Sequence, residues 1–324
     1  MFPYLLKFSV TNKCNLNCKH CFLDKNNQVE PSLEEIDKVF TELQNKYIGC
    51  LALTGGEPMV RKDFKEIVEL GSKHHIPIVI ATNGTLLTDD LIVFLKMHNV
   101  NKIQISLESY NREKNDYIRG IGVFDKVISA IDKLIENRFE VTIAYTLNHY
   151  NFRDMLKMIE FSNLKKVFAL RLELYLPLAQ EQYHDVFALT KKDILEIYNL
   201  IEFAHTQNNH IKIKYPFMNR KGCGAGVVQG IINSNLTLSP CDLLPDIHSK
   251  KFKEIGDLTQ IWNEDSIFLD WRNIKCSDSF CINDCKKRIG CHFGCRAAAL
   301  AYNGHLNASD YTCIYKLKGG NSYG

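Results

Sequence analysis

The segment Tyr4-Leu-Leu-Lys-Phe-Ser-Val-Thr-Asn-Lys-Cys-Asn-Leu-Asn-Cys-Lys-His-Cys21 joins a short apolar strand to a loop with three cysteines. Residues 4–10 form the expected strand, and the cysteines after it are spaced as Cys-x3-Cys-x2-Cys. In α/β folds the loops at the carboxyl ends of strands carry the ligands. We therefore expect this segment to begin a sheet and to bind metal at the edge of that sheet.

Strand and helix patterns alternate after this loop. The expected strands are 50–53, 77–81, 102–106, 140–146 and 167–172, and the expected helices are 32–46, 64–74, 89–97, 124–137, 153–162 and 191–208. Such alternation predicts right-handed βαβ units and a parallel sheet. About six units are too few for a closed eight-fold barrel. The expected fold class is therefore α/β, with a partial (β/α)6 TIM-like barrel.

Polar and metal-binding residue types follow several of these strands. The carboxyl ends carry Cys14–Cys21, Gly55–Glu57, Asn83 and Ser106–Glu108. Because parallel strands present these ends at one edge of a sheet, the four segments predict one shared site.

The composition is that of a globular protein. Hydrophobic residues make up 45% of the 324 residues, charged residues make up 24%, and the formal net charge is +3. This balance gives no reason to expect a nucleic-acid or membrane partner. No run approaches the roughly 18 to 20 apolar residues of a membrane span, and the N-terminus lacks the basic lead-in of a signal peptide. We expect a cytoplasmic protein.

The chain has twelve cysteines, which is many for a compartment where disulfides are rare. Three lie in residues 14–21, Cys50 stands alone, and eight lie between residues 223 and 313. Clustered cysteines of this kind more often bind metal or take part in catalysis. The lopsided distribution predicts two separate metal-binding regions, with Cys50 as a core residue.

The three N-terminal cysteines suit an iron–sulfur cluster. Three thiolates on a four-iron cluster leave one iron without a protein ligand. A zinc ion is the alternative, with His20 as its fourth ligand, although the place of His20 between two cysteines makes chelation awkward. Unliganded thiols are a further alternative.

The cysteine loop, followed by Thr54-Gly-Gly-Glu-Pro58, resembles the radical S-adenosylmethionine (SAM) superfamily. The resemblance implies that Cys14, Cys18 and Cys21 hold a catalytic cluster whose open iron chelates SAM. Reductive cleavage of SAM would then give a 5′-deoxyadenosyl radical that takes a hydrogen atom from the substrate. The resemblance also implies a set of SAM contacts: Gly55, Gly56, Glu57, Asn83, Ser106, Arg119, His20 and Phe22.

Structural alternatives stand beside these contacts. The Gly-Gly-Glu segment can be a simple strand-to-helix turn, Arg119 can have a capping or surface role, and Phe22 can be a core aromatic residue.

The run Cys281-x3-Cys285-x5-Cys291-x3-Cys295 resembles the SPASM extension of this superfamily. The resemblance implies a radical SAM core at 1–209 and a small cysteine-rich SPASM domain at 210–324. Within the second region, Asn233–Asn235 predict a β-hairpin turn, because Asn tolerates positive φ. It implies two auxiliary four-iron clusters, one on Cys281, Cys285, Cys291 and Cys313, and the other on Cys223, Cys241 and Cys295.

Two departures from the SPASM pattern are visible. The first spacing is x3 where x2 is common, and Asn235 stands in place of the usual hairpin glycine. The second set has no obvious fourth cysteine, so it is open to substrate, or it borrows Cys276 or an oxygen ligand. Cys276 can also be a hydrogen-atom donor or an ordinary thiol, and a zinc ribbon is the alternative for the whole region.

The resemblance implies an enzyme that modifies a ribosomally synthesised peptide, by a thioether or carbon crosslink, epimerisation or side-chain oxidation. A small-molecule tailoring enzyme, acting on sugars or in the haem pathway, is the alternative, and a non-enzymatic electron carrier is a third class. The expected partners are the peptide and a reductant such as flavodoxin or ferredoxin. Because the cysteine loop begins at residue 14, we expect peptide recognition to need a separate protein or direct contact with the peptide core.

Overall fold

The computed structural model describes residues 2–23, 28–207, 210–215, 223–285, 291 and 294–318. Its strands form one nine-stranded sheet in the order β7-β6-β5-β4-β3-β2-β1-β8-β9. The strands are β1 (Leu5–Thr11), β2 (Cys50–Gly55), β3 (Ile78–Thr82), β4 (Lys102–Ser106), β5 (Glu140–Leu147), β6 (Ala169–Leu174), β7 (Lys212–Lys214), β8 (Gln229–Ile232) and β9 (Leu238–Ser239). All neighbours pair in parallel except β8 and β9, which form an antiparallel hairpin.

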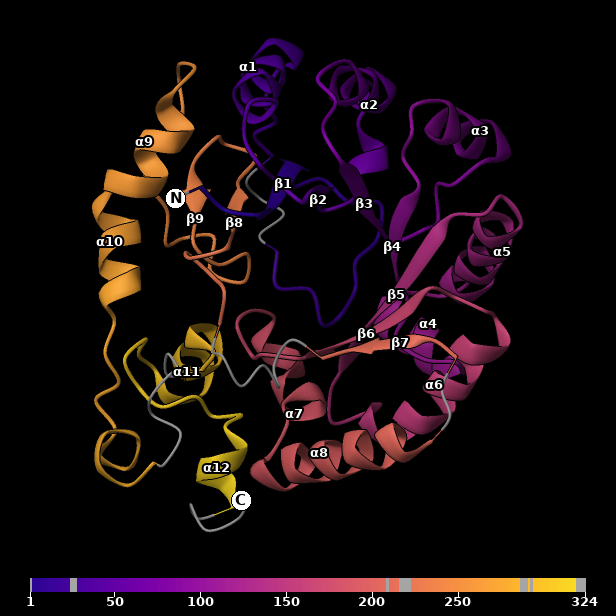
Figure 1. Cartoon of the computed structure of the whole chain (residues 1–324). Helices are drawn as coiled ribbons and strands as arrows, with labels where there is room; N and C mark the ends of the chain where they lie inside the picture. Colours follow the sequence, from indigo (N-terminus) through magenta and orange to yellow (C-terminus); the bar gives the residue numbers. More distant parts are fainter. Residues whose placement is uncertain are drawn as a thin grey trace.

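Helices follow most of the strands. They are α1 (Leu33–Leu43), α2 (Phe64–Lys73), α3 (Asp89–Met97), α4 (Arg112–Arg119), α5 (Val123–Glu136), α6 (Met155–Leu164), α7 (His184–Phe187), α8 (Lys191–Thr206), α9 (Asp257–Glu264), α10 (Ser266–Asn273), α11 (Arg296–Asn303) and α12 (Ile314–Leu317). In Figure 1 the strands follow a curve, α1, α2, α3 and α5 lie on its outer side, and the loop after β1 lies on its inner side. The expected α/β fold with a parallel sheet is confirmed.

The two faces of the sheet differ in character. In β1, Leu6, Phe8 and Val10 are buried in the main core, which lies between the sheet and the helices. Lys7 and Ser9 alternate with them and line a cavity on the inner face. Cys50 occupies the same inner face of β2, where it alternates with buried Leu51. It is only half-buried, so the prediction that Cys50 is a core residue is wrong.

Sheet pairing continues beyond residue 209. β7 pairs with β6 at one end of the sheet, and the β8–β9 hairpin pairs with β1 near the other. Periodicity did not predict β7, because three residues are too few to show an alternating pattern. The division into 1–209 and 210–324 stays a prediction, and one sheet crosses it.

The hairpin turn has its left-handed residue one position later than expected. Leu236 has φ of 63°, whereas the sequence predicts Asn235 in the glycine position. The Asn235 side chain instead accepts hydrogen bonds from the backbone N–H of Thr237 at 3.1 Å and from its hydroxyl at 2.8 Å. Leu236 is 1% exposed. Burial of its side chain offsets the backbone strain, which costs about 1–2 kcal/mol.

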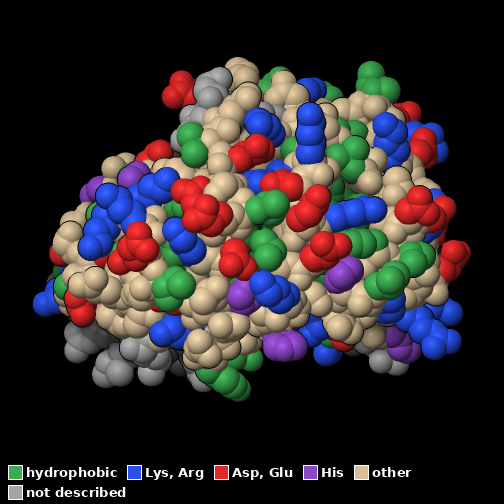
Figure 2. Space-filling model, turned by 90° about the horizontal axis from the view of Figure 1, so that it is seen from above, with side chains coloured by type: hydrophobic (Ala, Val, Ile, Leu, Met, Phe, Trp, Pro, Cys, Tyr) green, Lys and Arg blue, Asp and Glu red, His purple; other side chains and the backbone are tan. Residues whose placement is uncertain are grey.

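In the described part of the chain, no helix is long and apolar enough to cross a membrane. On the face shown in Figure 2, acidic and basic side chains are interspersed. That face therefore lacks the single-signed surface that favours nucleic-acid binding.

One buried carboxylate fastens the C-terminal region to α1. Glu42 accepts hydrogen bonds from the backbone N–H groups of Gly256 at 2.9 Å, Leu258 at 3.2 Å and Thr259 at 2.9 Å. These groups open α9, whose N-cap residue is Gly256 and provides no side-chain cap. Glu42 therefore acts as the cap from a distant helix, where its charge also suits the positive end of the helix dipole.

We predict that Glu42→Ala lowers the free energy of unfolding by about 2 kcal/mol, because several buried N–H groups lose their acceptor. Thermal denaturation and the rate of thermolysin cleavage near α9 measure the effect. Glu34→Ala is the matched control, since Glu34 lies on the same helix and its side chain is 82% exposed. We expect that control to stay within about 0.5 kcal/mol of the native protein. Equal losses in the two variants would contradict a specific capping role.

Candidate functional site

The cysteine loop begins at a very close contact between two backbone segments. Gly56 N–H donates to the Thr11 carbonyl at 2.8 Å, and Glu57 N–H donates to the Lys13 carbonyl at 2.9 Å. A Cβ added to Gly55 would lie 1.9 Å from the Thr11 oxygen, and one added to Gly56 would lie 2.2 Å from the Lys13 oxygen. Only glycine fits at both positions. The two glycines therefore seat the loop that carries Cys14.

Glu57 ties the end of β2 to the end of β3. It is fully buried, and it accepts hydrogen bonds from Met59 N–H at 3.2 Å, the Thr82 hydroxyl at 2.8 Å and Asn83 N–H at 2.6 Å. Burial raises the pKa of this carboxyl, against the lowering effect of these donors. A carboxylate accepts about four hydrogen bonds, so three internal donors leave room for one more. Contact between Glu57 and the methionyl amine of SAM stays a prediction.

Asn83 contacts the cysteine loop directly. Its Nδ2 donates to Asn15 Oδ1 at 2.8 Å and lies 3.9 Å from the Cys14 sulfur. Its Oδ1 accepts from the Thr85 hydroxyl at 2.6 Å. The end of β3 and the cysteine loop therefore meet, as expected of one shared site.

Behind the loop lies a buried ionic group formed by Glu108, Arg119 and His20. Glu108 Oε1 lies 3.2 Å from Arg119 Nη1 and 3.4 Å from His20 Nε2. The Cys18 sulfur is 3.9 Å from the backbone oxygen of Arg119. Burial raises the pKa of the Cys18 thiol, and the Arg119 guanidinium opposes that rise. Arg119 is 5% exposed, so the surface alternative for it is wrong.

Two nitrogens of this group have no hydrogen-bond partner among the described residues. They are Nδ1 of His20 and Nε of Arg119, and both are buried. Buried polar groups are almost always satisfied in a folded protein. These two nitrogens therefore mark space where a polar ligand fits beside Cys18.

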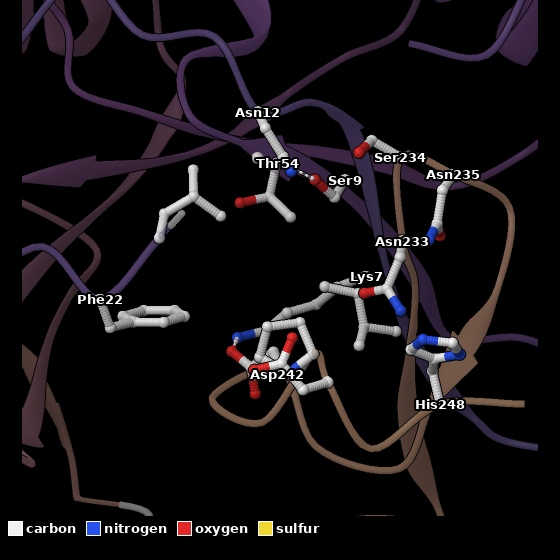
Figure 3. Close-up of a pocket in the computed structure, with 15 residues that line it drawn as sticks. Lys7, Ser9, Asn12, Phe22, Thr54, Asn233, Ser234, Asn235, Asp242 and His248 are labelled. Atoms are coloured by element: carbon white, nitrogen blue, oxygen red, sulfur yellow. Dashed lines mark hydrogen bonds and ion pairs between the residues drawn. The ribbon is translucent and has the colours of Figure 1, made fainter. Parts of the chain in front are cut away.

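A cavity of about 170 Å³ extends from the cysteine loop towards the hairpin. Its lining residues come from both predicted domains: Lys7, Ser9, Asn12, Phe22, Leu23, Thr54, Gly55, Ile231, Asn233, Ser234, Asn235, Asp242, Pro245, Asp246 and His248. Figure 3 shows Phe22, Thr54 and Asp242 around the same space. Phe22 is 36% exposed and is therefore not a core aromatic residue. Ser106 is half-buried at the end of β4 and does not line this cavity.

Asp242 forms an ion pair with Lys7 at the cavity wall. Its neighbour Cys241 belongs to a first group of C-terminal thiols with Cys223 and Cys295, and the three interact electrostatically. All three pack against one small apolar cluster. Burial raises the pKa of each thiol, that of Cys295 to about 12. Metal binding by these thiols would therefore release protons.

The second group of C-terminal thiols includes Cys276. The Cys281 thiol is hydrogen-bonded with Cys276 and interacts electrostatically with Cys313. Cys313 in turn interacts electrostatically with Cys291. Burial raises the pKa of Cys313 to about 11. Cys276 is 4% exposed. Its place beside Cys281 does not favour the idea that the Cys223, Cys241 and Cys295 set borrows it.

The cysteines carry no disulfide. All twelve lie in the described part of the chain, and none is in a disulfide. The unpartnered N–H donors beside Cys18 fit an iron–sulfur cluster or another polar ligand, because the sulfur atoms of such a cluster accept hydrogen bonds.

Comparison with known proteins finds a family and relatives whose names refer to SAM or to maturation. Residues 8–162 match the family model of the Radical SAM superfamily. The chain is 26% identical to the AdoMet-dependent heme synthase of Methanosarcina barkeri, over 97% of both chains. It is 25% identical to the mycofactocin maturase MftC of Mycobacterium tuberculosis, over 96% of this chain and 83% of the relative.

The fold also matches a solved structure. The chain superposes on Streptococcus suis SuiB bound to its precursor peptide SuiA with a TM-score of 0.80. The match covers 97% of this chain and 76% of SuiB, at 16% identity, and so concerns the fold.

We predict that Gly56→Ala removes iron from the N-terminal site, because its Cβ would meet the Lys13 backbone oxygen at 2.2 Å and push the cysteine loop away. Iron and sulfide analysis after anaerobic reconstitution measures the loss. Gly71→Ala is the matched control, since its Cβ would also meet an atom at 2.2 Å, but that atom is the tip of the Ile78 side chain, which can rotate. Full iron loading of Gly56→Ala would show that the loop does not depend on this contact.

Proposed function

We propose that this chain, a member of the radical SAM superfamily, uses a 5′-deoxyadenosyl radical to modify a ribosomally synthesised peptide. One observation carries the proposal. The cavity is bordered by Phe22 and Gly55 of the predicted SAM-binding motifs on one side and by Asp242, beside Cys241, on the other. A substrate in the cavity would therefore lie between the radical source and an auxiliary cluster.

Each part of the site has a role in this proposal. Cys14, Cys18 and Cys21 would hold the catalytic cluster, which supplies the electron that splits SAM when both are bound. Asn83 positions the loop, and the His20 and Arg119 nitrogens would donate to SAM. The predicted roles of Ser106, Glu57 and Phe22 as further SAM contacts belong to the same proposal.

The size and lining of the cavity favour one inserted residue of a peptide. Pockets that enclose a whole small ligand have volumes of roughly 300–1,000 Å³, whereas this cavity has about 170 Å³. Its walls carry hydroxyl and amide side chains, including Ser9, Thr54 and Asn235, and the ion pair of Lys7 with Asp242. Such groups suit peptide amides better than the large apolar plane of a tetrapyrrole. A curated relative named as a maturase supports the same class.

Similarity to the AdoMet-dependent heme synthase over nearly the whole chain favours a second candidate. In that case the substrate would be a tetrapyrrole, as in the small-molecule class considered from the sequence. Both candidates are enzymes, and neither relative is named as an electron carrier.

The two C-terminal thiol groups would hold auxiliary clusters. One would use Cys281, Cys285, Cys291 and Cys313, and the other would use Cys223, Cys241 and Cys295. The cluster on Cys223, Cys241 and Cys295 would lie nearer the cavity, because Cys241 precedes the lining residue Asp242. It would take up the electron left after bond formation. A flavodoxin or ferredoxin as reductant and a separate peptide-recognition protein complete the proposal.

We expect the reconstituted protein to convert SAM to 5′-deoxyadenosine under a strong reductant, as measured by chromatography. Cys18→Ala should give less than about a tenth of the native yield, because the cluster loses one of three thiolates. Cys50→Ala is the control, since Cys50 lies at the start of β2, away from the cysteine loop at the carboxyl ends. Equal yields from native protein and Cys18→Ala would contradict the radical mechanism.

The two substrate classes differ in which compound donates the abstracted hydrogen. We expect a deuterated precursor peptide to stimulate cleavage and to transfer deuterium into 5′-deoxyadenosine, as measured by mass spectrometry. An iron tetrapyrrole with propionate side chains, tested in parallel, should do neither. Deuterium transfer from the tetrapyrrole alone would replace the peptide proposal with the second candidate.

A further inference from the structure

Arg296 is a buried cation that lacks partners for part of its guanidinium group. It directly follows Cys295, begins α11 and is 5% exposed. Its Nη1 donates to the backbone oxygens of Leu306 at 2.6 Å and Ala308 at 3.1 Å. Its Nε and Nη2 are buried and have no hydrogen-bond partner in the described residues.

The nearby acid, Asp310, is engaged elsewhere. Its Oδ2 accepts from Cys295 N–H at 2.7 Å, and its Oδ1 accepts from the N–H of Thr312 at 2.8 Å and from the Thr312 hydroxyl at 2.7 Å. Within the described residues no salt bridge joins Arg296 to a carboxylate. Asp310 interacts electrostatically with Arg296 but leaves its Nε and Nη2 without an acceptor. Buried N–H donors of a charged group without acceptors are strongly unfavourable, so an anion with acceptor atoms fits at this place.

The first group of C-terminal thiols supplies the place for that anion. Arg296 interacts electrostatically with Cys223 and directly follows Cys295 in the chain. Both cysteines interact electrostatically with Cys241. An iron–sulfur cluster on three thiolates is anionic, and its sulfur atoms accept N–H hydrogen bonds. The two unpartnered nitrogen atoms of Arg296 therefore point to one anionic ligand.

We propose that Arg296 is the counter-charge and hydrogen-bond donor of the cluster held by Cys223, Cys241 and Cys295, and that it raises the reduction potential of this cluster. The inference rests on the auxiliary-cluster assignment in the proposed function. Reduction adds one negative charge to the cluster, and a fixed cation with N–H donors stabilises that charge in a dry site. Arg296 is thus a positioning residue that makes this cluster a better electron acceptor.

The effect should be confined to one of the two auxiliary clusters. Arg296 directly follows Cys295 and interacts electrostatically with Cys223, and both of these cysteines belong to the first thiol group. A change at Arg296 should therefore move the potential of the Cys295 cluster and leave the potential of the Cys313 cluster unchanged.

The test is a potentiometric titration followed by electron paramagnetic resonance. The background is the full chain with Cys14→Ala, Cys18→Ala and Cys21→Ala, which leaves only the auxiliary clusters. We expect two midpoint potentials, one of which is absent in Cys295→Ala. In Arg296→Met that same potential should shift to a lower value and the other should stay. In Arg296→Lys, which keeps the positive charge but loses the planar, forked set of N–H donors, the shift in potential should be smaller.

Arg272→Met is the matched control. The Arg272 side chain is also partly buried in the C-terminal region, but it donates to the backbone oxygens of Gly226 at 2.7 Å and Trp262 at 2.6 Å. We expect neither potential to move in this variant.

Iron analysis separates the possible failures. Unchanged potentials in a fully loaded Arg296→Met, equal shifts of both potentials, or loss of both clusters would each overturn the proposal. If Arg296→Met loses the Cys295 cluster alone, while Arg296→Lys keeps this cluster at a lowered potential, the proposal is supported. If both variants lose this cluster, Arg296 holds the fold of the site, and the claim on the reduction potential is overturned. Absence of auxiliary iron from the chain with native Arg296 would instead count against the proposed function.

Discussion

The close contact between Thr11–Lys13 and Gly55–Gly56 sets the position of everything else at the site. Two backbone segments approach so closely there that a single Cβ would lie within about 2 Å of a carbonyl oxygen. Because the contact is made by the backbone, it fixes the loop with Cys14 to the end of β2 without any flexible side chain. Glu57 accepts a hydrogen bond from Asn83 N–H at the end of β3, and the Asn83 side chain donates to Asn15 in the cysteine loop. The three cysteines are therefore held by the sheet itself.

A second theme is the incomplete hydrogen bonding of the interior. His20, Arg119 and Arg296 each have a buried nitrogen without a partner among the described residues, and each lies next to a cysteine of a predicted cluster. In most folded proteins such nitrogens are satisfied. Polar ligands at these places would complete the hydrogen bonding of the interior and would thereby stabilise the folded chain.

The sequence predicted the elements with strong local signals. The predicted bounds of α3 (Asp89–Met97) and β4 (Lys102–Ser106) agree with the structure, because a capping Thr88 and a clear apolar pattern define them. Short or tertiary features were missed. β7 exists only through its pairing with β6, and the left-handed Leu236 is tolerated only because its side chain is buried.

The site divides in the same way. Local cysteine spacing predicts which residues bind metal, and that assignment stays a prediction. The buried ionic group behind Cys18 could not be predicted in this way, because it depends on contacts between segments far apart in the chain. One such long-range pairing bears on how the chain assembles. Since β1 pairs with residues 50–55 on one side and with residues 229–232 on the other, its second edge stays unpaired during synthesis until about two thirds of the chain has emerged. An exposed strand edge is prone to mispairing, so the nascent chain passes through a stage vulnerable to aggregation. The cavity wall contributed by the hairpin is therefore synthesised only after the N-terminal cysteine loop and strands β2 to β7.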